Sequence, residues 1–389
     1  MKTVFFGPFV GEFGWEMLYW HAWINKVSEG TFKHHRKIIA SFPGRESFYP
    51  LADEYWAHPE EYLQYFKSCN GYITDFWKQG LPKGNASVKK KVLGVLPYES
   101  WRFFDAQIDQ EEVYRHADKL LMKYQDKLPA DTEYFVPFRD NTFRGLKFGV
   151  TSTEKANSQT EIVQQPIPFK EQRFKVLEAP DATMQSLNKL ISPDKDLIAI
   201  YPRNRINRRP DKNWDRDSYI QLIERLKSQF PTKVIGIFGA PGEAYFDDGV
   251  PEGCSDFINL PNDQRMNLQV AALKKAKIAV GSLSGAMVVA RSCDVPVVTW
   301  GLRRDASRFH QENQLNIESI FHPVQYPSVG EIFELVRAVL SEEIEYGSSY
   351  EKWCPQSYLV NREGRKQLLK FKIASFFDTM GYGVNRLFD

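Results

Sequence analysis

The chain has 389 residues, 42% of them hydrophobic and 26% charged, with a formal net charge of +2 at pH 7. This length exceeds one typical hydrophobic core, so we expect two domains, and the small net charge excludes a global field that would attract nucleic acid or an anionic membrane. Four scattered cysteines without metal-ligand spacing favour a reducing compartment, and no apolar run approaches the roughly 20 residues of a membrane span.

The first half of the chain predicts a βαβ unit. Apolar strands are expected at 2–9 and 37–44, with a helix at 15–27 between them. The runs 71–77 and 91–98 are expected to extend this series, and 110–128 has the periodicity of a surface helix. Residues 139–192 are polar and weakly periodic, which indicates an extended or partly irregular connection into the second domain.

The second half alternates strands and helices more clearly. Continuous Val/Ile runs separated by short loops are typical of a parallel sheet that is buried on both faces. The expected strands are 196–203, 233–243, 256–261, 277–285 and 295–301, and the expected helices are 218–230, 268–276 and 286–293. We therefore predict a doubly wound α/β domain here.

The loops that follow these strands carry the candidate binding residues, because open parallel sheets bind ligands at the carboxyl ends of their strands. They hold Arg203, Arg205, Arg208, Arg209 and Lys212 after the first strand, Gly239, Gly242 and Glu243 after the second, Ser282, Ser284 and Gly285 after the fourth, and Arg303 and Arg304 after the fifth. A Gly/Ser turn at a helix start offers free N–H groups, and arginines beside it neutralise a diphosphate. The alternative is a solvated cationic loop.

The stretch 195–305 resembles the donor domain of heptosyltransferase-type glycosyltransferases of the GT-B fold. The resemblance lies in a Lys-x-Trp before a helix, a strand ending in Gly, and a Ser-Gly-x-Met helix start before Pro-Val-Val. It implies that Lys212 and the turn Ser284, Gly285, Ala286 and Met287 hold the diphosphate of a nucleotide sugar, and that Glu243 or nearby backbone contacts the nucleoside. Arg203 and Arg205 resemble the phosphate-binding arginines of the related fucosyltransferase-like group.

Two departures from the family pattern concern the sugar. The family usually has Asp where this chain has Leu283, and His where it has Val288. A heptose donor is therefore not implied, and the nucleotide stays open.

The opening stretch "GPFVGEFGWEM" supplies the candidate bases. In the family the first strand runs into a Gly-Asp turn whose carboxylate acts as base, and the corresponding pair here is Gly11-Glu12. Gly11 and Gly14 allow a tight turn near ligand. Glu16, one helical turn later, is the competing base, with a helix-start carboxylate as its structural alternative.

These observations predict an inverting, metal-independent glycosyltransferase that has no cofactor and uses a nucleotide-diphosphate sugar as donor. We expect a Rossmann-like acceptor domain with its connecting segment at 1–190, a Rossmann-like donor domain at 191–340, and a helical tail at 341–389 that packs back on the first domain.

The acceptor is expected near Ser41–Pro50, with Arg45 and Tyr49 within reach. Basic stripes at 33–37, 88–92 and 138–147 would suit a glycan, a lipid-linked glycan or a modified DNA base, with peripheral membrane contact. The alternative is ordinary solvated cations balanced by the 49 acidic residues of the chain. A nucleotide-sugar epimerase and a non-catalytic nucleotide-sugar or glycan-binding protein are the alternatives, and the oligomeric state is open. The expected location is cytoplasmic.

Overall fold

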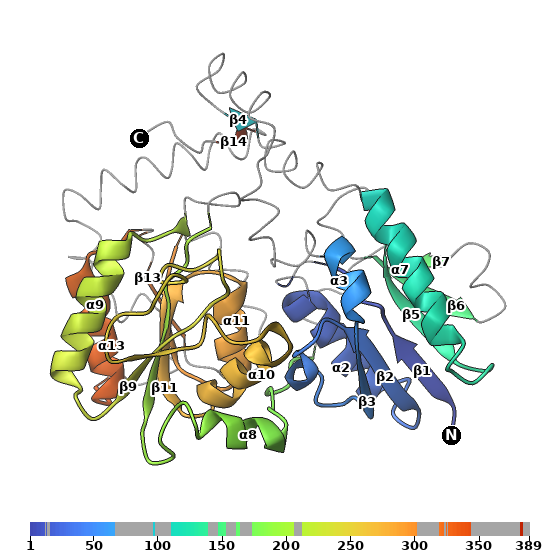
Figure 1. The fold of residues 1–389 in the computed structure, drawn as a ribbon, viewed down its shortest axis with the longest axis horizontal. Coiled ribbons are helices and arrows are strands. Elements are labelled where there is room, and N and C mark those ends of the chain that lie inside the picture. The colour runs from blue at the N-terminus through green and yellow to red at the C-terminus, as the bar shows by residue number, and fades with distance from the viewer. Residues whose placement is uncertain are drawn as a thin grey trace.

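The computed structural model of the chain describes residues 1–11, 13, 16–66, 96–97, 110–138, 147–152, 161–163, 173–205, 212–301, 319–322, 324, 326–343 and 382–383. These residues form two α/β domains, each built on a six-stranded sheet, which lie side by side (Figure 1). Among the helices described, none is long and apolar enough to cross a membrane.

The first sheet has the order β3-β2-β1-β5-β6-β7. Its strands are β1 (Thr3–Phe6), β2 (Arg36–Ser41), β3 (Glu54–Ala57), β5 (Glu133–Phe138), β6 (Lys147–Ser152) and β7 (Glu161–Val163). The four strands from β3 to β5 are parallel, and β6 and β7 extend the sheet in antiparallel fashion. The first domain is thus Rossmann-like with an antiparallel edge.

Two neighbouring phenylalanines of β1 show how helices cover both faces of this sheet. Phe5 packs against Tyr124 of α7 (Gln110–Gln125), at 5.5 Å between ring centroids. Phe6 packs against Trp23 of α2 (His21–Glu29), at 5.8 Å. Successive side chains of a strand point to opposite faces, so a run that is apolar at every position can be buried by helices on both sides. The short helices η1 (Glu16–Trp20), η2 (Glu46–Phe48) and α3 (Glu60–Phe66) complete the first domain.

The second sheet is parallel throughout and has the order β10-β9-β8-β11-β12-β13. Its strands are β8 (Leu197–Tyr201), β9 (Val234–Ile237), β10 (Cys254–Asp256), β11 (Ala276–Ser282), β12 (Val297–Trp300) and β13 (Ser319–His322). When these six strands are numbered from 1 to 6 along the chain, their order in the sheet is 3-2-1-4-5-6. This is the doubly wound order of dinucleotide-binding folds, which reverses direction between strands 1 and 4, here β8 and β11.

The helices of the second domain divide between the two faces of its sheet. Side chains of α9 (Arg216–Gln229) and α13 (Val329–Leu340) share one core cluster with Ile198, Ile200 and Val280. Side chains of α10 (Asn262–Leu273) and α11 (Gly285–Ser292) join Ala199, Ala279 and most of the core of the first domain in the other cluster. The α10/α11 face is therefore the one that meets the first domain, as Figure 1 also shows.

Specific contacts connect the two domains. Ser47 donates its backbone N–H to Oδ1 of Asn267 at 3.1 Å, and both residues are buried. Gly44 has a φ of +74°, and a Cβ built there would lie 2.5 Å from the carbonyl oxygen of Asp263, so only glycine fits this crossing. Helix α8 (Asp181–Leu187) packs against α10 at the base of the interface.

The structure corrects two strand predictions and adds detail to the connecting segment. Within 139–192 the described residues form β6, β7 and α8 and an irregular stretch at 173–180. The described part of 91–98 is β4 (Leu96–Pro97), which pairs antiparallel with β14 (Tyr382–Gly383) outside the main sheets. The strand expected at 256–261 is β10, which ends at Asp256. Asp256 pairs with Ile237, and the partner strand β9 ends at that residue.

Other predictions lie wholly or mainly outside the described residues. These are the run 71–77 and, apart from 341–343 and β14, the helical tail.

Candidate active site

A pocket lies between the two domains at the carboxyl ends of β8 and β11, the switch point of the second sheet. It holds about 950 Å³ of empty space, counting its open mouth. Its lining residues are Phe13, Arg45, Tyr201, Arg203, Arg205, Phe238, Gly239, Ala240, Glu243, Ala244, Arg265, Met266, Gln269, Ser284, Gly285, Ala286 and Val289. Two Rossmann-like domains that face a shared pocket form the GT-B arrangement.

The loop after β8 is held in shape by Asn213. Its side-chain oxygen accepts from the backbone N–H of Arg205 at 3.0 Å and from the Arg203 guanidinium, and its amide nitrogen donates to the carbonyl oxygen of Arg205 at 3.0 Å. The next residue, Trp214, is 1% exposed and donates its indole N–H to the carbonyl oxygen of Pro327 at 3.0 Å. The buried indole fixes Asn213, which in turn fixes the arginine loop.

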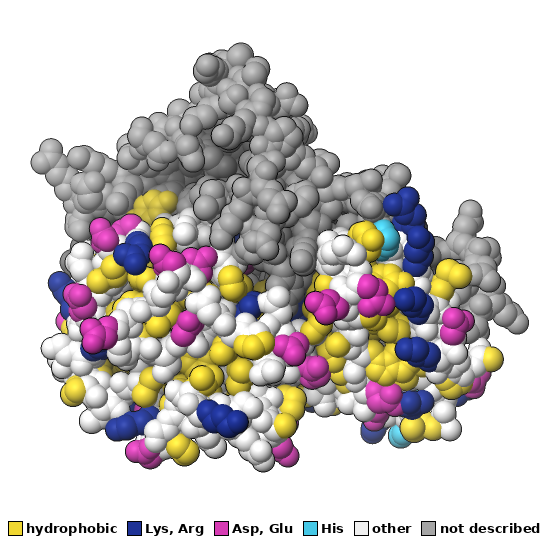
Figure 2. All heavy atoms as spheres, viewed as in Figure 1, with side chains coloured by type: hydrophobic (Ala, Val, Ile, Leu, Met, Phe, Trp, Pro, Cys, Tyr) yellow, Lys and Arg dark blue, Asp and Glu magenta, His cyan; other side chains and the backbone are white. Residues whose placement is uncertain are grey.

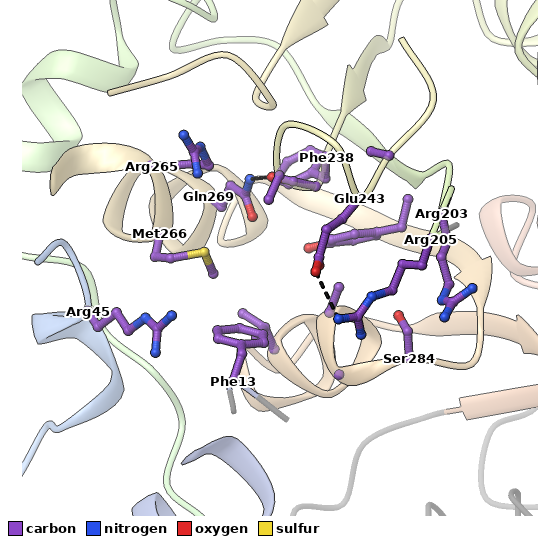
Figure 3. Close-up of a pocket in the computed structure, with 17 residues that line it drawn as sticks. Phe13, Arg45, Arg203, Arg205, Phe238, Glu243, Arg265, Met266, Gln269 and Ser284 are labelled. Carbon is purple, nitrogen blue, oxygen red and sulfur yellow. Dashed lines mark hydrogen bonds and ion pairs between the residues drawn. The ribbon is translucent and has the colours of Figure 1, made fainter. Parts of the chain in front are cut away.

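The loop after β9 pairs with this arginine loop. Tyr245 donates its backbone N–H to the carbonyl oxygen of Pro202 at 2.7 Å, and Asn204 donates its own to the carbonyl oxygen of Glu243 at 2.8 Å. An ion pair of 2.8 Å joins Nη2 of Arg205 to Oε1 of Glu243 (Figure 3). Both side chains are mostly buried, so the guanidinium is positioned before any ligand binds.

The helix α11 begins at the same end of the pocket. Ser284 is its N-cap in an extended conformation, and Ser284, Gly285 and Ala286 line the wall. Figure 3 shows Arg203, Arg205 and Ser284 gathered at one end. Backbone N–H groups of a first helical turn and two guanidinium groups together suit a phosphate anion.

The first domain contributes Arg45 and Phe13 to the opposite end of the pocket. The Arg45 guanidinium lies 5.0 Å from the ring centre of Phe13 and forms an ion pair with Glu16, both side chains being almost fully buried. Glu16 also accepts from the hydroxyl groups of Tyr49, at 2.6 Å, and Ser41. Burial and the neighbouring Glu16 carboxylate raise the pKa of Tyr49 well above its usual value, so Tyr49 stays a donor.

Eight residues singled out from sequence meet in this pocket, namely Arg45, Arg203, Arg205, Gly239, Glu243, Ser284, Gly285 and Ala286. Ser282 and Met287 are buried beneath the turn, and Lys212 and Gly11 are half-buried outside the pocket lining. Glu16 is fully buried in the network just described. Glu12, Gly14, Arg208, Arg209, Arg303 and Arg304 lie outside the described residues.

Sequence reasoning missed Asn213, Arg265, Met266 and Gln269. Asn213 is the middle residue of the Lys-x-Trp signal, which could have marked it. The other three come from α10, which begins at Asn262, whereas the pattern predicts a helix only from 268, and nothing in the sequence marks them as pocket residues.

The basic stripes expected near the acceptor are only partly within the described residues. In the stretch 33–37, Arg36 pairs with Glu54 and Lys37 pairs with Asp53 at 3.2 Å, which neutralises both of these cations. Figure 2 shows instead a column of Lys and Arg side chains over α7, where Arg115, Lys119 and Lys123 are exposed at four-residue spacing.

No family model matches the sequence, and no curated protein matches it either. Among solved structures, E. coli ADP-heptose LPS heptosyltransferase II has 13% identity and a TM-score of 0.46, covering 88% of this chain and 99% of that one. A glycosyl transferase family 9 protein from Veillonella parvula has 11% identity and a TM-score of 0.45, covering 88% and 97%. E. coli heptosyltransferase WaaC with ADP has 12% identity and a TM-score of 0.37, covering 88% and 99%. Likeness at this level carries no argument about activity, which has to be derived from the pocket.

Proposed function

We propose that this chain is an inverting, metal-independent glycosyltransferase that moves a sugar from a nucleoside diphosphate sugar to a hydroxyl acceptor. The observation that carries the proposal is the joint presence of Arg203, Arg205 and the start of α11 in one pocket shared by both domains. A donor held by the second domain would thereby meet an acceptor held by the first.

The diphosphate is the leaving group in this proposal. Negative charge builds on its oxygens as the glycosidic bond breaks, and donors already aimed at that position stabilise the transition state more than the ground state. Arg205 supports this role because Asn213 and Glu243 hold its backbone and guanidinium in place. Glu243 also suits the ribose hydroxyl groups as an acceptor.

Glu12 is the base in this proposal. It takes the proton of the acceptor hydroxyl while that oxygen bonds to the anomeric carbon, and the diphosphate leaves with the electrons of the broken bond. One displacement inverts the anomeric centre.

Glu16 is assigned a positioning role instead. Its carboxylate is fully buried and already accepts from Ser41, Tyr49 and Arg45, so it is poorly suited to receive a proton from an acceptor. Through Arg45 it would stabilise the acceptor side of the pocket.

Metal independence follows from the same cations. Two arginines at the diphosphate can supply the positive charge that a divalent ion supplies in other transferases. Activity that EDTA abolishes and Mg²⁺ or Mn²⁺ restores would contradict this part of the proposal.

The acceptor would approach along the first domain, past Phe13 and Arg45. Glycans, lipid-linked glycans and modified DNA bases are the classes to compare, because each offers a hydroxyl group near phosphate or other polar groups.

A donor screen tests the proposal against its alternatives. The protein is incubated with common nucleotide sugars, and free nucleoside diphosphate and changed sugars are measured. A transferase leaks some donor to water, an epimerase converts the sugar, and a binding protein leaves the donor intact. An Arg205→Ala control should lose the hydrolysis, which separates it from a contaminating activity.

A further inference from the structure

Gln269 lies at the corner of the pocket formed by the carboxyl ends of β9 and β10. Its side chain is held by two hydrogen bonds, because Nε2 donates to the carbonyl oxygen of Gly239 at 2.7 Å and to that of Phe257 at 2.8 Å. The residue is only 3% exposed, yet it lines the pocket.

These two bonds fix the orientation of the amide. A carboxamide nitrogen has two hydrogens, and both are used here. A flipped amide would set its oxygen against two carbonyl oxygens, so the observed orientation is the stable one. The amide oxygen therefore lies on the side away from Gly239, toward Met266, as Figure 3 shows.

The surroundings make this oxygen selective. Phe238, Ala240 and Met266 give the corner apolar walls. A ligand that fills the corner displaces water from the amide oxygen, and a buried acceptor left without a donor weakens binding considerably. Only a ligand that brings its own N–H or O–H is accommodated without that loss.

We propose that Gln269 selects the nucleobase of the donor by accepting a hydrogen bond from an N–H on the edge of the base. This inference rests on the proposed function, since it sets the base at Gln269 and the diphosphate at Arg205 and Ser284. The apolar walls then contact the faces of the base, and the amide oxygen accepts a hydrogen bond from its edge.

The first test uses the unaltered protein and pairs of ligands. The tightest binder among ADP, GDP, CDP and UDP is compared by calorimetry with an analogue that lacks the relevant N–H. The analogue is purine riboside 5′-diphosphate for ADP, the N3-methyl diphosphate for UDP and the N4,N4-dimethyl diphosphate for CDP. For GDP two analogues are needed, inosine 5′-diphosphate, which lacks the exocyclic amino group, and the N1-methyl diphosphate, which lacks the ring N–H. We expect the analogue to bind about tenfold more weakly or worse.

The second test repeats both titrations with Gln269→Met. The variant should lose the preference, binding parent and analogue within about twofold of each other, an effect much smaller than one lost hydrogen bond. Gln264→Met, on the exposed face of the same helix, is the matched control and should keep the preference. If Gln269→Met does not fold, the ligand pairs on the unaltered protein still decide whether the base edge is read.

Three results would overturn the inference. A folded Gln269→Met variant that keeps the preference would show that another group selects the base. Equal binding of parent and analogue by the unaltered protein would remove Gln269 as the selecting residue while leaving the diphosphate site intact. Failure of all four nucleoside diphosphates to bind would remove the proposed function, and the inference with it.

Discussion

The Arg205 guanidinium lies 2.8 Å from the carboxylate of Glu243, across the pocket end where the loops after β8 and β9 meet. The two side chains are 20% and 24% exposed, so the pair is neither fully screened by water nor fully desolvated. Such a pair adds little to folding stability, under about 1 kcal/mol, and its main effect is to orient both groups.

Glu243→Ala should weaken binding of the nucleoside by about 1–3 kcal/mol, because a contact to the ribose is lost. Binding of the nucleoside diphosphate should weaken at least as much, because Arg205 also loses the carboxylate that orients its guanidinium. Calorimetry with both ligands measures this. Glu224→Ala, an exposed glutamate on α9, is the control and should change neither affinity. An unchanged nucleoside affinity would show that Glu243 has no contact with that part of the donor.

Glu12 and Glu16 should respond differently to the same substitution. Glu12→Gln should lower turnover by about 10²–10⁴-fold and leave diphosphate binding intact, as loss of a general base does. Glu16→Gln removes the carboxylate that faces the buried Arg45, which should lower the free energy of unfolding by about 3–5 kcal/mol. Steady-state kinetics and urea denaturation of both variants decide the roles. Wild-type turnover in Glu12→Gln would remove Glu12 as the base.

Gly44→Ala should destabilise the interface between the domains. Its positive φ and the 2.5 Å approach to the Asp263 backbone mean that an added Cβ forces the second domain to shift. Overpacking of this kind costs about 1–3 kcal/mol.

Gly30→Ala is the matched control for Gly44→Ala. At Gly30 the φ is −100°, and the nearest atom to a built Cβ is 3.4 Å away. Thermal unfolding of both variants measures the effect. Equal melting temperatures would contradict the close contact between Gly44 and the backbone of Asp263.

Two buried histidines predict a loss of stability in acid. Burial lowers the pKa of His58 to about 3 and that of His21 to about 4, from 6.5. Below pH 6.5 the unfolded chain takes up these protons while the native protein does not, so stability is complete above pH 6.5 and falls as pH drops toward the folded values. Each histidine should cost about 2 kcal/mol between pH 7.5 and pH 5.

His58→Gln isolates one of these contributions. The ring donates from Nε2 to the carbonyl oxygen of Phe9 at 2.7 Å, a bond that glutamine can replace without titrating. The variant should lose less stability than the parent between pH 7.5 and pH 5 in urea denaturation. The exposed His34→Gln should match the parent. If His58→Gln and the parent lose the same stability between pH 7.5 and pH 5, buried His58 does not contribute to the loss of stability in acid.

The sequence was most informative where structure is local. The apolar runs of β8, β9, β11 and β12 were predicted because each buried parallel strand is continuous in sequence, and the loops after them were predicted to meet because parallel strands end at one edge. Gln269 could not be found this way, because it reaches the pocket from a helix and its position depends on tertiary packing that no periodicity encodes. Arg45 was expected near the acceptor, but its place in the same pocket as Arg203 and Arg205 also depends on how the two domains pack.

The first domain was harder to predict for a similar reason. Strand β5 follows a helix and carries charge and proline, β6 has mixed side chains and pairs antiparallel on both sides, and β7 is an edge strand of three residues. Short strands of mixed composition show little periodicity, so their pattern is weak.

Arg205→Ala tests the central claim, which is that this pocket binds the diphosphate of a nucleotide donor. Calorimetry with a nucleoside and its diphosphate should show the diphosphate weakened by about 1.5–3 kcal/mol, the range for charged hydrogen bonds, and the nucleoside almost unchanged. Arg225→Ala, an exposed arginine on α9, should leave both affinities at the parent values. Equal losses for the two ligands in Arg205→Ala would mean that the loop supports the base pocket or the fold, and would contradict the diphosphate site.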